Sequence, residues 1–367
     1  MKRHPFDISK FPYPIAEVYY YLPQTAERGF RKVGGVVGAV QNAVIFFETL
    51  CRFCVWEMLM EYARSGACNT KLNQQLEQFF FQSAGKLSTG KWVDLWRELS
   101  RHLYPLRQSL FMPEMPCVFF NPNGFSKVAA ESIDPFPKER NEALGHVNTI
   151  PSPAAQADFY MMMREKLLQI LGALSFLENY CLISVISADI CVVKKAYLLE
   201  GPGRKSGEFE VHDSDIALRS DQEIRNNMTL IVGRDALEEP KEATPFLLYP
   251  VFLFDALKYE DPSRNEDPLS DAPDDIYVLT SIEHKRKEIR ELVFSGHRQD
   301  CAEKKYGHES KEPDYLAVLE KFGLLLARMG IRDLVARTET SKPSPFDSSQ
   351  EDDLERLLKI YLERRKT

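Results

Sequence analysis

Hydrophobic residues recur at helical spacing through the first half of the chain, up to about residue 180. The segment from Ala39 to Arg64 is apolar on more than one side, which is typical of a helix buried on several faces. A later segment confines its apolar residues to one stripe, formed by Trp92, Leu95, Trp96 and Leu99. The predicted helices cover residues 39–64, 70–83, 88–102, a stretch from about 137, and 154–180.

The hydrophobic pattern changes after residue 181, where Ile and Val become frequent. Short apolar segments bounded by turn residues predict a small antiparallel sheet, with strands within 181–199, 207–211, 228–232, 245–254 and 275–281. An amphipathic helix is predicted over 313–330, and a Ser/Pro linker over 338–349 leads to a last helix. The pattern predicts an α+β chain with a helical domain (1–182), a smaller β-containing domain (183–310) and C-terminal helices (311–367).

Composition indicates an ordinary globular protein, since 44% of the 367 residues are hydrophobic and 28% are charged. The net charge of −7 is distributed unevenly. Residues 1–180 carry 19 Lys and Arg against 17 Asp and Glu, whereas residues 181–367 carry 28 against 37. An acidic chain is a poor candidate for non-specific DNA binding, which depends on neutralising many phosphates. Local binding of RNA by the first half is compatible with these charges.

The seven cysteines are odd in number and irregular in spacing, which predicts reduced thiols and a cytoplasmic location. Cys51 and Cys54 lie inside a predicted helix without a second pair, so we expect no metal site there. The N-terminal residues lack the apolar run of a signal peptide. Polar residues interrupt the most apolar stretch, 167–198, so no membrane span is predicted.

The most informative polar residues are Arg140, Asn141 and His146, which follow Pro135 and Pro137. Because proline is tolerated only in the first turn of a helix, a helix is predicted to begin near Pro137. His146 can exchange a proton near neutral pH, Arg140 fits phosphate oxygens, and Asn141 can bind phosphate or orient the histidine. RNA carries its own nucleophile, the 2′-hydroxyl. These groups therefore suit phosphodiester cleavage without a metal or cofactor.

Arg-Asn-x4-His at a helix start, inside a helical region spanning residues 30–182, resembles the HEPN superfamily, whose common signature is Arg, four to six residues, then His. The resemblance implies an all-α HEPN-like bundle that cuts RNA, with Arg140, Asn141 and His146 as catalytic residues. It also implies a homodimer with a shared cleft, and a role as a toxin or effector in prokaryotic defence. We expect the C-terminal part to restrain the nuclease, through a regulatory signal or protein partner.

Further charged residues are candidates for supporting roles. Glu142 is placed to influence His146, and Lys138 lies two residues before Arg140. Arg101, His102 and Arg107 form a basic cluster at the end of the predicted helix 88–102, where RNA is a candidate ligand. A simpler interpretation of this cluster is a set of cations that the negative end of the helix dipole favours.

Two other functions fit the same sequence. On a straight helix Arg140 and His146 point about 120° apart, so they are also compatible with separate surface roles in a non-catalytic HEPN-like dimerisation or adaptor module. Such a module would bind a protein or nucleotide partner. The glycine-rich segment 201–207, with Arg204 and Lys205, is a weaker candidate for a nucleotide-binding sensor, because a solvated hairpin loop has the same composition.

Overall fold

The computed structural model describes most of residues 6–331, and all described residues belong to one compact unit, residues 1–334. The described ranges are 6–23, 33, 35–66, 69–81, 88–146, 153–189, 192–201, 210–219, 224–226, 228–238, 245–254, 276–285, 288–296, 304–307, 315–329 and 331. Within the motif, the side chains of residues 142–146 fall outside this description. The segment 201–207, apart from Gly201, and the predicted linker and last helix also fall outside it.

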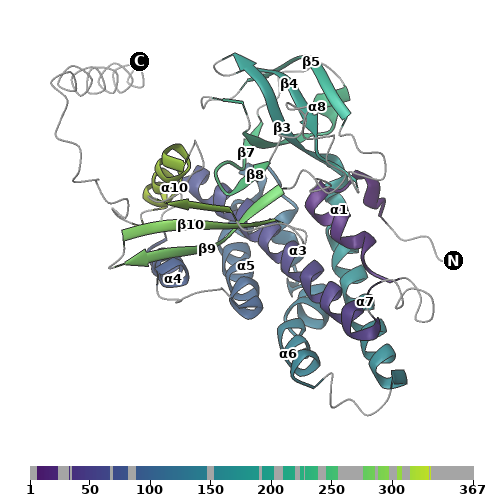
Figure 1. The fold of residues 1–367 in the computed structure, drawn as a ribbon. Coiled ribbons are helices and arrows are strands. Elements are labelled where there is room, and N and C mark those ends of the chain that lie inside the picture. Colours follow the sequence, from purple (N-terminus) through teal and green to yellow (C-terminus); the bar gives the residue numbers. More distant parts are fainter. Residues whose placement is uncertain are drawn as a thin grey trace. The chain divides into compact units, whose positions relative to one another are not determined.

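The helical part is built around the long helix α3 (Figure 1). The helices are α1 (Tyr13–Tyr20), α3 (Gly35–Ser65), α4 (Thr70–Phe81), α5 (Thr89–Leu103), α6 (Phe136–His146) and α7 (Pro153–Ala173). Helix α3 contacts α1, α5 and α7, and its buried residues lie on several sides, as the sequence predicts. The Ser88 hydroxyl caps α5 by accepting from the Lys91 amide (3.5 Å). None of the described helices is long enough and apolar enough to cross a bilayer.

The predicted helix over 154–180 is shorter in the structure. Helix α7 ends at Ala173, and a 3-10 helix (Ser175–Asn179) leads directly into strand β3 (Tyr180–Asp189). The residues from 181 onward pair with neighbouring strands, so a helix cannot continue into them. The end of the helix is therefore set by sheet pairing rather than by local propensity.

Antiparallel strands form two main sheets, where the sequence predicts one. The five-stranded sheet has the order β5-β4-β3-β6-β7, with β4 (Val192–Leu198), β5 (Glu210–Arg219), β6 (Thr229–Gly233) and β7 (Phe246–Leu247). The four-stranded sheet has the order β11-β10-β9-β8, with β8 (Phe252–Phe254), β9 (Ile276–Lys285), β10 (Glu288–Gly296) and β11 (Lys304–Gly307). A bridge between Met228 and Leu253 joins the two sheets. Helices with antiparallel sheets confirm the predicted α+β class.

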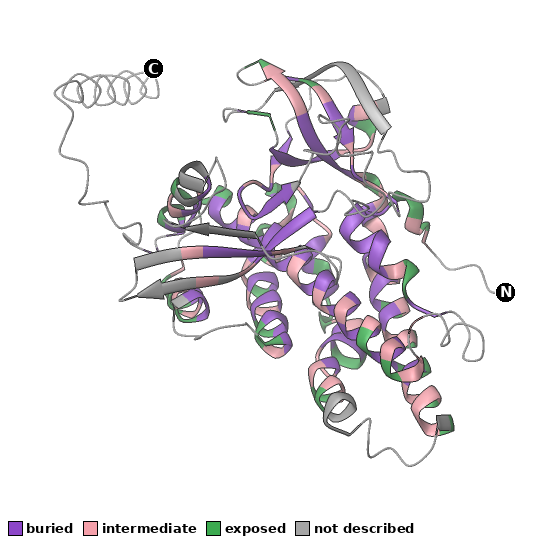
Figure 2. Ribbon diagram, viewed as in Figure 1, coloured by how far each residue is buried: buried purple, intermediate pink, exposed green. Residues whose placement is uncertain are grey.

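One hydrophobic core joins the helices to both sheets. Buried residues continue from α3 and α5 into β8 and β9 (Figure 2). In β3 the side chains alternate, with Leu182 in this core and Cys181 and Ile183 in a smaller cluster on the opposite face of the sheet. The predicted domain boundary at residue 182 lies inside β3. Helix α10 (Tyr315–Arg328), in the predicted C-terminal part, also contacts α3.

Trp56 is a specific link between α3 and the four-stranded sheet. Its indole Nε1 donates to the backbone carbonyl of Leu279 (2.9 Å), and its ring packs against Phe80 and Phe322. Trp96 is equally buried, but its Nε1 has no hydrogen-bond partner in the described part of the chain. Comparing substitutions at these two residues therefore separates the contribution of a hydrogen bond to stability from that of ring packing.

We expect Trp56→Phe to lower the free energy of unfolding by about 1 kcal/mol more than Trp96→Phe does. Both substitutions remove similar buried volume, but only Trp56→Phe removes a hydrogen bond. Urea unfolding followed by circular dichroism measures the difference. Equal losses in the two variants would show that the bond to Leu279 makes no net contribution.

Candidate functional site

Helix α6 carries the motif and is anchored at its first residue. Phe136 stacks on Phe47 of α3, with ring centroids 3.9 Å apart and planes inclined by 13°. The carbonyl of Pro135 accepts from the amides of Lys138 and Glu139, both at 3.1 Å. The helix therefore begins where the two prolines predict, and the stacked rings fix its start against α3.

Arg140 joins a polar cluster that connects α3, α5 and α6. Its Nη2 lies 3.7 Å from Glu48 Oε1, and its Nη1 donates to Asn141 Oδ1 (3.1 Å). Glu48 also pairs with Arg52 (3.3 Å) and accepts a short hydrogen bond from the Thr89 hydroxyl. We call Glu48, Arg52, Thr89, Arg140 and Asn141 the Glu48 cluster.

The Glu48 cluster has surplus positive charge, because two guanidinium groups share one carboxylate. Another nearby carboxylate, Glu139, is paired with Lys166 of α7. Burial lowers the pKa of Arg52, and the charge of Glu48 opposes that shift. The Arg140 side chain is 31% exposed, and Asn141 is exposed. The cluster thus offers a partly open, cationic site for an anion such as phosphate.

His146 is the last residue of α6, six residues after Arg140. That spacing corresponds to about 9 Å along the helix axis. The side chains of His146 and Glu142 lie outside the described residues, so their distances to the Glu48 cluster are not part of the structure. Lys138 is exposed on the same helix. The structure therefore places Arg140 and Asn141 together, and locates His146 by its backbone.

The predicted basic cluster of Arg101, His102 and Arg107 lies elsewhere. Thr89, a member of the Glu48 cluster, is in the first turn of α5, and Arg101 lies twelve residues further on, about 18 Å along the axis. The His102 ring packs edge-on against Tyr62 (5.3 Å), and burial lowers its pKa. The structure does not bring this basic cluster together with Arg140.

Sequence analysis missed Glu48, Arg52 and Thr89 as parts of the site. Glu48 and Arg52 are four residues apart in a largely apolar helical segment. Charged residues that face each other at this spacing in a buried helix need polar partners, and that signal was available in the sequence. Thr89 carries no such signal, because only the packing of α5 on α3 brings it to Glu48.

Other features of the described residues bear on ligand binding. A pocket of about 440 Å³ lies between α4 and α5, and it includes none of the predicted catalytic residues. No group of three or more His, Cys, Asp or Glu side chains in the described ranges is arranged to hold a metal ion. Comparison of the chain with protein-family models, curated proteins and solved structures gives no match.

Proposed function

We propose that the helical part of this chain is a HEPN-like RNA endonuclease that works without a metal. The observation that carries the proposal is the position of Arg140. It lies near the start of α6, next to Asn141, in a partly exposed cluster with surplus positive charge. Together with the Arg-Asn-x4-His pattern, this cluster supports binding and charge stabilisation of a phosphodiester.

In the proposed reaction, His146 takes the proton of the RNA 2′-hydroxyl, and the 2′ oxygen forms a bond to phosphorus. The bond from phosphorus to the 5′ oxygen breaks. The products are a 2′,3′-cyclic phosphate and a 5′-hydroxyl, after the leaving oxygen receives a proton. Arg140 stabilises the growing negative charge on the phosphoryl oxygens, and Asn141 orients Arg140 through its carbonyl oxygen.

The reaction requires Arg140 and His146 side chains to face the same phosphodiester, and a homodimer can meet this requirement. Arg140 and His146 point about 120° apart on one straight helix, so two copies that share a cleft provide both groups from opposite sides. The second imidazole, in its protonated form, supplies the proton for the leaving oxygen. A cytoplasmic role as a defence toxin or effector, restrained by the C-terminal part, is proposed on the family resemblance alone.

The test is cleavage of transfer RNA and total RNA by the purified full chain in EDTA. We expect the wild type to cut, and Arg140→Ala and His146→Ala each to lower the rate by about 100-fold or more. Arg328→Ala removes an exposed arginine from α10 and serves as the matched control, with unchanged cleavage. Cleavage at the wild-type rate by both motif variants, with circular dichroism unchanged, would exclude the proposed site.

A specific observation favours a second candidate function, a non-catalytic dimerisation or adaptor module. The charge of Arg140 is partly satisfied by Glu48, as expected for a residue that fastens α6 to α3. In that case Arg140→Ala weakens dimerisation or stability, and neither the wild type nor the variant cuts RNA. Sedimentation velocity beside the cleavage assay distinguishes the two functions.

A further inference from the structure

Cations and aromatic rings alternate on a surface at the C-terminal end of α5. The Arg107 guanidinium lies over the Tyr104 ring (4.4 Å), and the Arg101 guanidinium lies over the Phe120 ring (5.8 Å). Tyr104 and Phe120 are 6.1 Å apart, and Phe125 meets Phe120 edge-on at 5.7 Å. We call Arg101, Tyr104, Arg107, Phe120 and Phe125 the aromatic platform.

Two rings of the aromatic platform, Phe120 and Phe125, lie on the short hairpin of β1 (Phe120–Asn121) and β2 (Gly124–Phe125). Strand β2 begins at Gly124, whose φ of +110° is a conformation that residues other than glycine rarely adopt. After the hairpin, the Ser126 amide donates to the carbonyl of Phe119 (2.8 Å). Phe119 is buried against Trp96 of α5, so the hairpin is fastened to the core. These contacts position the backbone of Phe120 and Phe125 against α5.

The aromatic platform is also open to solvent. Phe125 is 41% exposed, which is unusual for a large apolar ring. Among the described residues Arg107 has no ion pair, and it donates only to the carbonyl of Tyr104 (3.0 Å). The Arg101 side chain is 54% exposed and pairs with Glu98 of the same helix. The surface thus presents one exposed ring, Phe125, beside the half-buried rings of Tyr104 and Phe120, and it includes Arg107, which has no carboxylate partner among the described residues.

We propose that the aromatic platform binds a single-stranded RNA segment. Bases stack on Phe125 and Phe120, and Arg107 contacts the adjacent phosphates, as expected where ring faces and cations alternate. A purely apolar peptide would leave the Arg107 guanidinium without an anionic partner, so this charge favours a nucleic acid. The choice of RNA over single-stranded DNA rests on the proposed function.

The aromatic platform differs from the proposed cleavage site in position. Arg101 lies about 18 Å along α5 from Thr89, a member of the Glu48 cluster. The two sites are therefore separate, and only a strand of several nucleotides can contact both. Loss of the aromatic platform is expected to weaken binding of longer strands without removing the cleavage chemistry.

The experiment measures fluorescence anisotropy of labelled single-stranded RNA and of DNA with the same sequence, using the full chain with His146→Ala in EDTA. Phe125→Ala is expected to weaken binding of both strands about fivefold or more, because stacking accepts any base. Phe125→Trp retains affinity, whereas Phe125→Leu loses it, since leucine keeps apolar area without a ring. Arg107→Gln is expected to reduce the salt dependence of the binding affinity by the contribution of about one phosphate contact.

The matched control is Tyr20→Ala, which removes an exposed ring from α1 and should leave binding unchanged. The proposal would be overturned if Phe125→Ala left the affinity unchanged, or if Phe125→Leu kept full affinity. It would also be overturned if the protein with an unmodified platform bound neither strand. Binding of an aromatic peptide instead of either strand would also overturn it. If RNA is cleaved but the platform variants bind it normally, this inference fails and the proposed nuclease stands. If binding depends on the platform but RNA is not cleaved, this inference stands and the proposed nuclease fails.

Discussion

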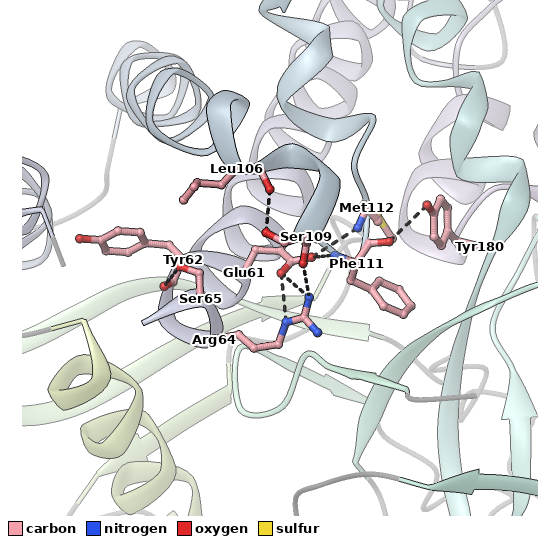
Figure 3. Close-up of polar contacts among 9 residues, drawn as sticks. All are labelled: Glu61, Tyr62, Arg64, Ser65, Leu106, Ser109, Phe111, Met112 and Tyr180. Carbon is pink, nitrogen blue, oxygen red and sulfur yellow. Dashed lines mark hydrogen bonds and ion pairs between the residues drawn. The ribbon is translucent and has the colours of Figure 1, made fainter. Parts of the chain in front are cut away.

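Replacement of Glu61 by alanine is expected to lower the free energy of unfolding by about 3–5 kcal/mol, a large part of the stability of a typical domain. Glu61 is buried near the end of α3 and binds the segment that follows α5 (Figure 3). Its carboxylate accepts from the amides of Phe111 and Met112, the latter at 3.3 Å, and lies 3.0 Å from the Arg64 guanidinium. Alanine would leave these donors without their acceptor.

The control for Glu61→Ala is Glu131→Ala. The Glu131 carboxylate is 59% exposed and lies 3.8 Å from Lys127, so its removal should change stability by less than about 1 kcal/mol. Urea unfolding at neutral pH measures both variants. Similar small losses in the two would show that the buried contacts of Glu61 do not hold the segment in place.

The second large effect is a dependence of stability on pH that comes from Glu57. Glu57 lies one turn before Glu61, is 0% exposed, and neither of its carboxylate oxygens has a hydrogen-bond partner in the described structure. Burial raises its pKa well above the ordinary value of 4.5, and the charges of Glu61 and Glu114 raise it further, against the effect of Arg64. Burial thus favours the protonated form of Glu57. Burial also raises the pKa of Glu61, against the lowering effects of Arg64 and of the Phe111 and Met112 amides.

A carboxyl whose pKa is higher in the folded state favours folding at low pH. The contribution of Glu57 is therefore fully present below about pH 4.5 and is lost as pH rises through its raised folded pKa. Each pKa unit corresponds to about 1.4 kcal/mol of stability. Glu57→Gln keeps the shape without the charge, so we expect it to remove this fall and to be more stable than wild type at the alkaline end.

Thermal unfolding at a series of pH values from acid to alkaline, at constant ionic strength, measures the effect of Glu57→Gln. The groups around Glu57 that also titrate or carry charge include Cys54, Glu61, Arg64, Glu114 and Tyr180. Because they remain in the variant, the difference between the two curves reports Glu57 together with its interaction with Glu61. Parallel curves would mean that Glu57 does not change its protonation on unfolding.

Local signals predicted the helices well. The apolar stripe and capping serine define α5, and the prolines before Arg140 define the start of α6. The second sheet was missed because β10 was not predicted as a strand, although it forms a hairpin with β9. Strand β10, with charged residues at 288, 290 and 291, has weak strand character in sequence, yet it pairs with β9 along most of its length. The hydrogen bond that links this sheet to α3 could not be predicted from a local pattern, because Trp56 and Leu279 are 223 residues apart in the chain.

The candidate site was predictable only where its functional side chains are adjacent in the sequence. Arg140 and Asn141 are adjacent, and the structure places their side chains in contact. Glu48 lies 92 positions before Arg140 and contacts it only after α6 packs on α3, so no local pattern links the two. The roles of Arg101 and Arg107 follow from rings that the fold brings beneath their guanidinium groups.

The most direct measurement follows one scissile bond in EDTA. After the cleavage position in a short RNA is mapped, the nucleotide on its 5′ side is replaced by its 2′-deoxy form. The proposed chemistry predicts a 2′,3′-cyclic phosphate from the unmodified RNA, and no cleavage at that bond in the modified RNA, because the nucleophile is gone. Continued cleavage of the modified bond, or cleavage only after a divalent metal is added, would contradict a metal-independent reaction at Arg140 and His146.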